Sequence, residues 1–217
     1  MKTTLQSIVL ASGLALAAVS NASATTVYSQ VVNYADQGAY FAEDPDTTAY
    51  DDFRLATAAS VNGVKIWGLY WEDGVVPSPV NFRVSFYTTE NNWTNPLFSK
   101  VVTASSVIDT GFNHNDVESA NILEIQLDLG SNVLFDAGVS YWLGIQAINP
   151  LGNDFAWQNS FAANNLYYQN NSAMRGEADV AFELSASDAN ALPEPASLSL
   201  LGLGLAGLAG LRRRKFK

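Results

Sequence analysis

The chain has 217 residues, of which 21 are acidic and 11 basic, and it contains no cysteine. The lack of cysteine excludes disulfide bridges, thiol nucleophiles and thiolate metal sites, so a folded core must rest on apolar packing. Six basic residues lie near the two ends, which leaves five against twenty acidic ones between Thr25 and Asn190 and argues against binding to nucleic acid or anionic lipid.

The first 24 residues have the features of a secretory signal peptide. Lys2 precedes an apolar run over residues 8–19, and Ala22-Ser23-Ala24 supplies the small residues that signal peptidase accepts. An N-terminal transmembrane helix is the alternative, but the run is short and ends in that cleavage pattern. We therefore predict a signal peptide over residues 1–24, removed by signal peptidase after Ala24, and an exported domain over residues 25–187.

Alternation of apolar and polar residues predicts β-strands throughout the exported domain. The clearest cases are residues 80–87, 123–129 and 179–184, where every second residue is apolar. Further strands are predicted over residues 27–34, 53–57, 61–71, 97–104 and 139–148. No helical periodicity separates these segments, so we predict an all-β fold, an antiparallel two-sheet sandwich of jelly-roll type.

The densest acidic run lies early in this domain. Clustered carboxylates repel one another unless a cation neutralises them, and Ca²⁺ prefers six or more oxygen ligands. The alternative is a solvated acidic loop, because no EF-hand spacing is present. Calcium is therefore a hypothesis, and no other cofactor is expected. The speculative calcium ligands are Glu43, Asp44, Asp46, Asp51 and Asp52.

Exposed tryptophan rings are a second candidate, because they stack on sugar rings while amides and carboxylates bind sugar hydroxyls. Most tryptophans in a β-sandwich belong to the core. Trp93 lies in a loop-like, asparagine-rich segment and Trp157 adjoins Gln158, so these three residues are the speculative glycan-binding set. Trp142 falls on the polar face of the strand predicted over 139–148, where it must be either covered or exposed.

Catalytic constellations are not evident in the sequence. His114 is the only histidine and stands in the loop-like Asn113-His114-Asn115-Asp116, so we predict a solvated loop residue. A serine hydrolase triad would need a Gly-x-Ser-x-Gly turn or an equivalent, and a histidine-rich zinc site needs more than one histidine. Paired carboxylates suit glycosidase chemistry, but so many are present that they discriminate nothing. We predict no catalytic residue.

The C-terminal segment combines three features in a fixed order. A small polar linker over residues 188–192 leads to Pro193-Glu194-Pro195, and residues 196–211 then form an uncharged stretch of sixteen residues. A helix of that length spans about 24 Å, short of a hydrocarbon core of about 30 Å, so it would cross a bilayer only marginally. Basic residues that belong on the cytoplasmic side end the chain, namely Arg212, Arg213, Arg214, Lys215 and Lys217.

These features resemble the PEP-CTERM sorting signal of Gram-negative bacteria. The resemblance implies that residues 193–217 form a sorting tail and that an exosortase in the inner membrane processes it near Pro193, Glu194 and Pro195, with release toward the cell surface or an exopolysaccharide matrix. The motif is also catalogued under an ice-binding name, but Thr47-Thr48 and Thr88-Thr89 do not repeat at the spacing of an ice-binding array.

The sequence therefore predicts an exported protein, anchored transiently in the inner membrane and then located at the surface or in the biofilm matrix of a Gram-negative bacterium. The leading interpretation is a non-catalytic β-sandwich for adhesion or scaffolding, with extracellular polysaccharide as a candidate partner. A calcium-dependent carbohydrate-binding module is the alternative, and a glycosidase-like enzyme is a weaker one. Nucleic acid is not expected as a partner.

Overall fold

The chain folds into strands, and there are more of them than the alternation predicts. The computed structural model describes residues 24–35, 38–42, 47–71, 75–90, 93–114, 120–148, 154–161, 166–169, 172–175 and 179–187, all within one unit, Ser23–Asp188. The strands are β1 (Ala24–Gln30), β2 (Ala39–Phe41), β3 (Ala49–Arg54), β4 (Ala59–Tyr70), β5 (Asn81–Tyr87), β6 (Phe98–Asn113), β7 (Asn121–Phe135), β8 (Ser140–Ala147), β9 (Phe155–Gln158), β10 (Leu166–Gln169), β11 (Ser172–Arg175) and β12 (Phe182–Ser187).

The all-β prediction is confirmed, because the described residues contain strands and turns but no helix. Within the same ranges, no helix is long and apolar enough to span a membrane.

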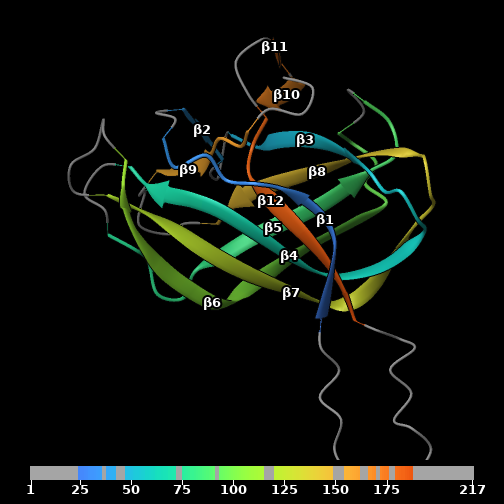
Figure 1. Ribbon diagram of the computed structural model, residues 1–217, viewed down its shortest axis with the longest axis horizontal. Helices are drawn as coiled ribbons and strands as arrows, with labels where there is room; N and C mark the ends of the chain where they lie inside the picture. The colour runs from blue at the N-terminus through green and yellow to red at the C-terminus, as the bar shows by residue number, and fades with distance from the viewer. Residues whose placement is uncertain are drawn as a thin grey trace, which may run out of the picture. The chain divides into compact units, whose positions relative to one another are not determined.

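These strands pair antiparallel with one another in one continuous sheet. Ten of them follow one another as β1-β12-β4-β7-β6-β5-β8-β3-β10-β11, while β9 joins β4 at the side and β2 joins β9. β6 links the two halves because its first residues pair with β5 and its later residues pair with β7. Figure 1 shows β12, β4 and β7 crossing in front of β5 and β8.

Phe53 of β3 shows that the two halves of this order share one core. Its ring centroid lies 5.7 Å from that of Tyr28 in β1, 5.2 Å from Phe135 in β7 and 6.2 Å from Phe182 in β12. Such aromatic contacts add to the stabilisation that burial of apolar area provides. The prediction of two separate packed sheets stays a prediction, because the pairing is continuous through β6.

The predicted alternation is present in β7, where one face enters the core and the other faces outward. Leu123, Ile125 and Leu127 are buried, whereas Glu124 is half-buried and Asp128 exposed. β8 differs, because both of its faces are covered. Its core face is apolar as predicted, and Trp142 on its other face is buried beneath further aromatic residues.

The first and last described residues lie side by side. Ala24 at the start of β1 pairs with Ser187 at the end of β12, and the antiparallel ladder continues to the pair Gln30 and Phe182. β12 in turn pairs with β4, so the last strand lies between the first strand and the long fourth one.

Candidate functional site

A polar groove lies on the outer face of β12, β4 and β7. Cross-strand pairing aligns Ser185 of β12 with Gly63 of β4 and Asp128 of β7. Gly63 has no side chain and is buried, because its neighbours close over it; a Cβ placed there would lie only 2.4 Å from Ser185 Oγ and 3.1 Å from Gln126 Nε2. These residues line a cavity of about 370 Å³, and its polar lining includes Thr26, Asn62, Lys65, Gln126, Asp128, Glu183 and Ser185.

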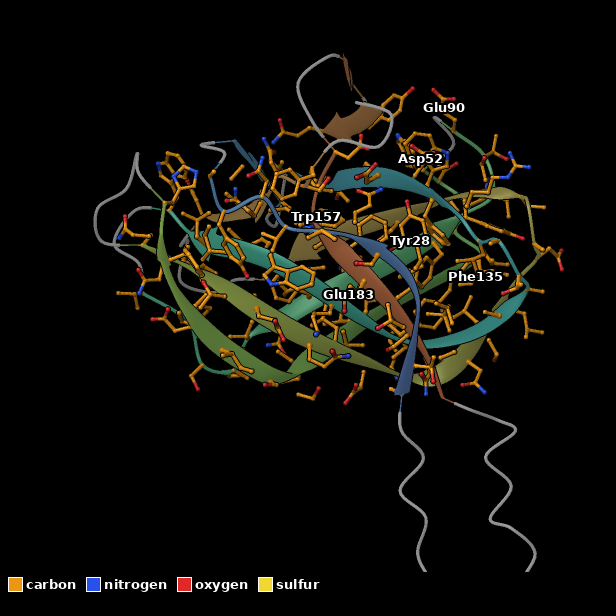
Figure 2. All side chains as sticks on the ribbon, in the orientation of Figure 1. Tyr28, Asp52, Glu90, Phe135, Trp157 and Glu183 are labelled. Atoms are coloured by element: carbon orange, nitrogen blue, oxygen red, sulfur yellow. The ribbon has the colours of Figure 1, made fainter. Side chains whose placement is uncertain are left out.

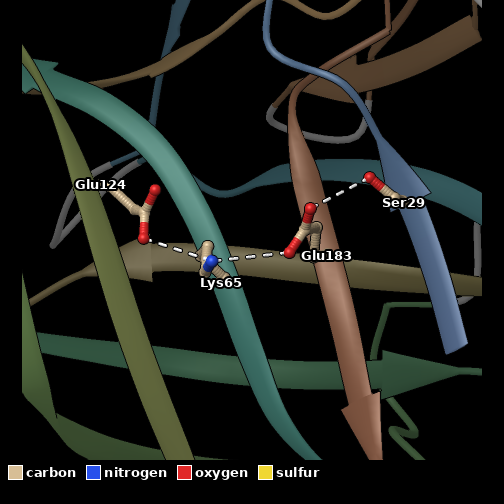
Figure 3. A network of polar contacts seen from close by, with 4 residues as sticks. All are labelled: Ser29, Lys65, Glu124 and Glu183. Atoms are coloured by element: carbon tan, nitrogen blue, oxygen red, sulfur yellow. Dashed lines mark hydrogen bonds and ion pairs between the residues drawn. The ribbon is translucent and has the colours of Figure 1, made fainter. Parts of the chain in front are cut away.

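Lys65 stands in the next row of the same face, between two carboxylates. Its Nζ lies 3.2 Å from Glu124 Oε1 and 3.5 Å from Glu183 Oε2. Ser29 Oγ of β1 donates to the other oxygen of Glu183 at 3.2 Å. Figure 3 shows this network running across four neighbouring strands, from β7 through β4 and β12 to β1.

The network keeps the Lys65 ammonium charged. Burial by itself lowers the pKa of Lys65, but the hydrogen bond and charge of Glu124 and the charge of Glu183 outweigh burial, so that pKa lies above its ordinary value. Half-exposed ion pairs of this kind contribute only about 0–1 kcal/mol each to stability. The network therefore matters more for the charges that it fixes beside the cavity than for the fold.

Several groups in the groove have hydrogen-bonding capacity to spare. Among the described residues, the side chains of Asn62, Gln126 and Asp128 make no hydrogen bond or ion pair. Gln126 lies directly opposite Lys65, in the row next to that of Asp128 and Gly63. The arrangement can therefore offer amide donors and acceptors, a carboxylate and an ammonium to one small polar molecule.

Trp93, the first of the predicted glycan-binding residues, is half-buried in an aromatic cluster on the other half of the sheet. Its ring stacks on Tyr50 at 4.0 Å and meets Tyr87, Trp142 and Tyr168 edge to face at 5.3–5.6 Å. Burial, followed by the charge of the neighbouring Tyr87, raises the pKa of Tyr50 to about 12. Trp93 thus covers the outer face of β3, β5 and β8. Trp142 is buried because Trp93 and the neighbouring tyrosines lie over it.

The expectation that Trp157 and Gln158 are exposed is wrong. Both side chains are fully buried in β9, which pairs with β4 and with β2. Trp157 Nε1 donates to the Ala181 carbonyl oxygen at 2.8 Å, and Gln158 Nε2 donates to the Asn33 carbonyl oxygen at 3.2 Å. Figure 2 shows Trp157 among the strands and Glu183 on the outer face of β12. A glycan therefore has no access to either of these two side chains.

The structure describes only part of the acidic run that was predicted to bind calcium. Glu43, Asp44 and Asp46 lie outside the described residues, whereas Asp51 and Asp52 are adjacent in β3 and so point to opposite faces. Asp51 is fully buried, and its carboxylate accepts from the N–H of Val180 at 2.9 Å and from the N–H of Asp52 at 2.8 Å. In the described ranges, no three acidic or histidine side chains gather as a metal site. Calcium binding stays a prediction.

The prediction of a solvated His114 is wrong. Its side chain is 1% exposed, and its ring meets Trp71 edge to face at 5.2 Å. The backbone N–H of His114 donates to the Ala120 carbonyl oxygen, so the residue that follows β6 is bonded to the one that precedes β7. The histidine packs as part of the fold rather than lining the groove.

The groove itself was not predicted from the sequence. Its polar residues were visible as the outward side of residues 123–129 and 179–184, but alternation does not show which strands lie next to each other. The local sequence gives no signal for the groove, because its lining comes from four strands that become neighbours only in the folded sheet.

The C-terminal region carries a known sorting motif. Residues 191–215 match the PEP-CTERM protein-sorting motif, which confirms the resemblance of this segment. The matched residues, including Pro193-Glu194-Pro195 and the basic cluster, lie outside the described residues, as do residues 1–23. The motif implies an exported protein that is sorted to the surface of a Gram-negative bacterium and processed by an exosortase. No curated protein matches the chain.

Proposed function

We propose that the chain is a surface or exopolysaccharide-matrix protein whose β domain, arranged as a two-layer sandwich, serves adhesion or scaffolding without catalysis. The sorting motif at residues 191–215 carries this proposal. In it, residues 1–24 are the signal peptide, the helix over 196–211 holds the chain transiently in the inner membrane, and the basic cluster from Arg212 lies on the cytoplasmic side.

Charge and packing support a passive role for the domain. Between Thr25 and Asn190, twenty acidic residues against five basic ones keep such a domain soluble outside the cell and away from anionic lipid. Glu124 and Glu183, the carboxylates beside Lys65, both bind its ammonium group. Glycoside hydrolysis needs one carboxyl as a proton donor and a second as base or nucleophile, a division of roles that a shared ammonium does not favour.

The test follows the chain through the envelope of a Gram-negative host that has an exosortase. We expect the wild-type chain to reach the surface or matrix in a shortened form. A variant with Pro193, Glu194 and Pro195 all replaced by Ala should stay in the membrane fraction with its tail intact. Surface labelling and mass spectrometry of both forms measure this difference.

A variant with Asp136→Asn, an exposed carboxylate in the turn before β8, serves as the control and should be sorted like the wild type. Recovery of the wild-type chain from the cytosol with residues 1–24 still attached contradicts the proposal. Equal delivery of the triple variant to the surface contradicts it as well.

A further inference from the structure

The groove on β12, β4 and β7 has the chemistry of a sugar-binding site, and we propose that it binds a neutral hexose residue of an extracellular polysaccharide. The inference rests on the proposed function in one respect, because only an exported domain meets such polysaccharides. It names a ligand class and a site that the sorting motif does not supply.

The size and lining of the cavity select a small and polar ligand. Its volume of about 370 Å³ lies near the lower end of small-molecule pockets, which occupy about 300–1,000 Å³. Such pockets are mostly apolar with a few polar groups. This one is lined by two amides, two hydroxyls, an ammonium and two carboxylates, so a compound rich in hydroxyl groups matches it better than an apolar one.

The uncommitted groups of the groove match what sugar hydroxyls need, since each hydroxyl both donates and accepts. The amides of Asn62 and Gln126 each offer two donors and an acceptor, and Asp128 offers two acceptor oxygens. None of these three side chains has a partner among the described residues. Lys65 has three N–H donors, of which two are directed to Glu124 and Glu183, so one is left for a ligand.

Charge separates neutral sugars from acidic ones. Beside the cavity, Asp128, Glu183 and Glu124 bring three negative charges, and Lys65 is the single cation among the described lining residues. Two of the three carboxylates hold that cation between them. A uronate or a sulfated sugar would therefore meet net repulsion, whereas a neutral hexose would not.

The geometry of the sheet holds these groups in fixed positions. Ser185 and Asp128 flank Gly63 from the two neighbouring strands, so they stand roughly 10 Å apart at a strand spacing of about 4.8 Å. Ser185 Oγ occupies the space over Gly63, so the sugar ring would lie beside the glycine, against Asn62, Gln126 and Asp128. Groups on paired strands are positioned more firmly than groups on loops, so little ordering is lost on binding.

The experiment uses the full chain in mild non-ionic detergent and native gels containing dextran, mannan or galactan as neutral probes, with alginate as the anionic comparison. We expect at least one neutral probe to retard the wild type and alginate not to do so. Asp128→Ala and Gly63→Val should weaken the retardation at least about tenfold, because the first removes an acceptor and the second displaces the Ser185 and Gln126 side chains that line the cavity.

Two controls locate the effect. Asp136→Ala removes an exposed carboxylate outside the groove and should bind like the wild type, as should Trp93→Ala, which alters the aromatic cluster. Melting temperatures of all variants show that they are folded; if Gly63→Val is not, Asp128→Ala and Asn62→Ala decide the matter.

Three outcomes overturn the inference: no retardation by any neutral probe, retardation that survives the groove variants, or loss of retardation with Trp93→Ala alone. These results are separate from sorting. If the wild-type chain reaches the surface but binds no neutral probe, only the proposed sugar site is contradicted. If the chain binds sugar but stays in the cytosol, the proposed function is contradicted instead.

Discussion

Asp51 is an ionisable side chain sealed inside the domain. It is 0% exposed and accepts two backbone N–H groups, one from Asp52 in its own strand and one from Val180 just before β12. Burial raises the pKa of Asp51 well above the ordinary value of 3.8, and the nearby charge of Asp179 raises it further. The folded state therefore keeps the Asp51 proton to a higher pH than the unfolded state does.

This difference predicts a pH dependence of stability. The stabilising contribution of protonated Asp51 is fully present below the unfolded pKa and is lost as pH rises through the folded pKa. We expect the melting temperature to fall as pH rises above the ordinary pKa of 3.8, and to fall less in Asp51→Asn, which cannot titrate. Thermal melts by circular dichroism measure both slopes.

Asp136→Asn is the matched control for Asp51→Asn, because it removes an exposed carboxylate and so corrects for general repulsion among the acidic residues. The absolute stability of Asp51→Asn is a separate matter, since an amide can accept only one of the two N–H groups. Equal slopes for the wild type and Asp51→Asn would contradict the prediction.

At the scale of the strands, β3, β5 and β8 carry the buried aromatic residues Tyr50, Tyr87 and Trp142 on their outer face, and few residues cover them. Trp93 is the central cover, because it stacks on Tyr50 and contacts Trp142. Tyr168 of β10 lies beside both tryptophans, and its hydroxyl donates to Glu90 Oε1. The segment before β6 and the late strand β10 thus close the same patch.

Replacing Trp93 with Ser should uncover this patch. We expect a loss of about 1–3 kcal/mol in the free energy of unfolding, less than for a fully buried ring because Trp93 is half-buried. The pKa of Tyr50, now about 12 because of burial, should fall toward its ordinary value of 10.0. Urea unfolding and an absorbance titration of the tyrosines measure these changes, and an unchanged titration would show that Trp93 does not cover Tyr50.

Glycines in β4 provide a second test at this scale. A Cβ on Gly68 would lie 2.5 Å from the Ala156 carbonyl oxygen, a backbone atom of β9, whereas the closest atom at Gly63 is the Ser185 hydroxyl oxygen, which can rotate away. We expect Gly68→Ala to cost at least about 1–3 kcal/mol and Gly63→Ala much less. Melting of the two variants side by side decides this, and equal losses would contradict the close approach of β4 and β9.

The sequence predicted the elements with one apolar face far better than the others. Alternation located β5, β7 and β12 because each sends every second side chain into the core. It missed the second half of β6, where residues on both faces are exposed, and the short strands β2, β9, β10 and β11. Gln158 suggested an exposed, loop-like segment around Trp157, but its amide donates to a backbone carbonyl inside the domain.

The candidate site could be predicted only in part, because local sequence patterns do not show which strands pair. The polar faces of β7 and β12 were visible in the sequence. The row that joins Glu183, Lys65 and Gln126 depends on which strands pair and in what register, and that is fixed by burial across the whole sheet rather than by local pattern. Trp93 was recognised as unusual, but its partners come from four other strands or segments.

At the scale of the whole molecule, the last strand completes the domain. β12 lies between β1 and β4, so it supplies hydrogen bonds to both neighbours. Phe182 and Leu184 are fully buried, and Phe182 contacts Tyr28, Phe53 and Trp157. Two core side chains and two ladders therefore depend on six residues at the end of the domain.

This arrangement predicts a sharp boundary for folding. A chain of residues 24–187 should melt cooperatively at the same temperature as the full chain, because β12 ends at Ser187 and the unit Ser23–Asp188 contains the core. A chain of residues 24–181 should fail to fold, since losing Phe182 and Leu184 alone removes about 3–6 kcal/mol of burial, comparable to the whole stability of many domains. Circular dichroism melts of both chains test the boundary. A cooperative transition in the shorter chain would show that β1 and β4 can close the sheet without β12, and a loss of folding in the longer one would show that the tail contributes to the core.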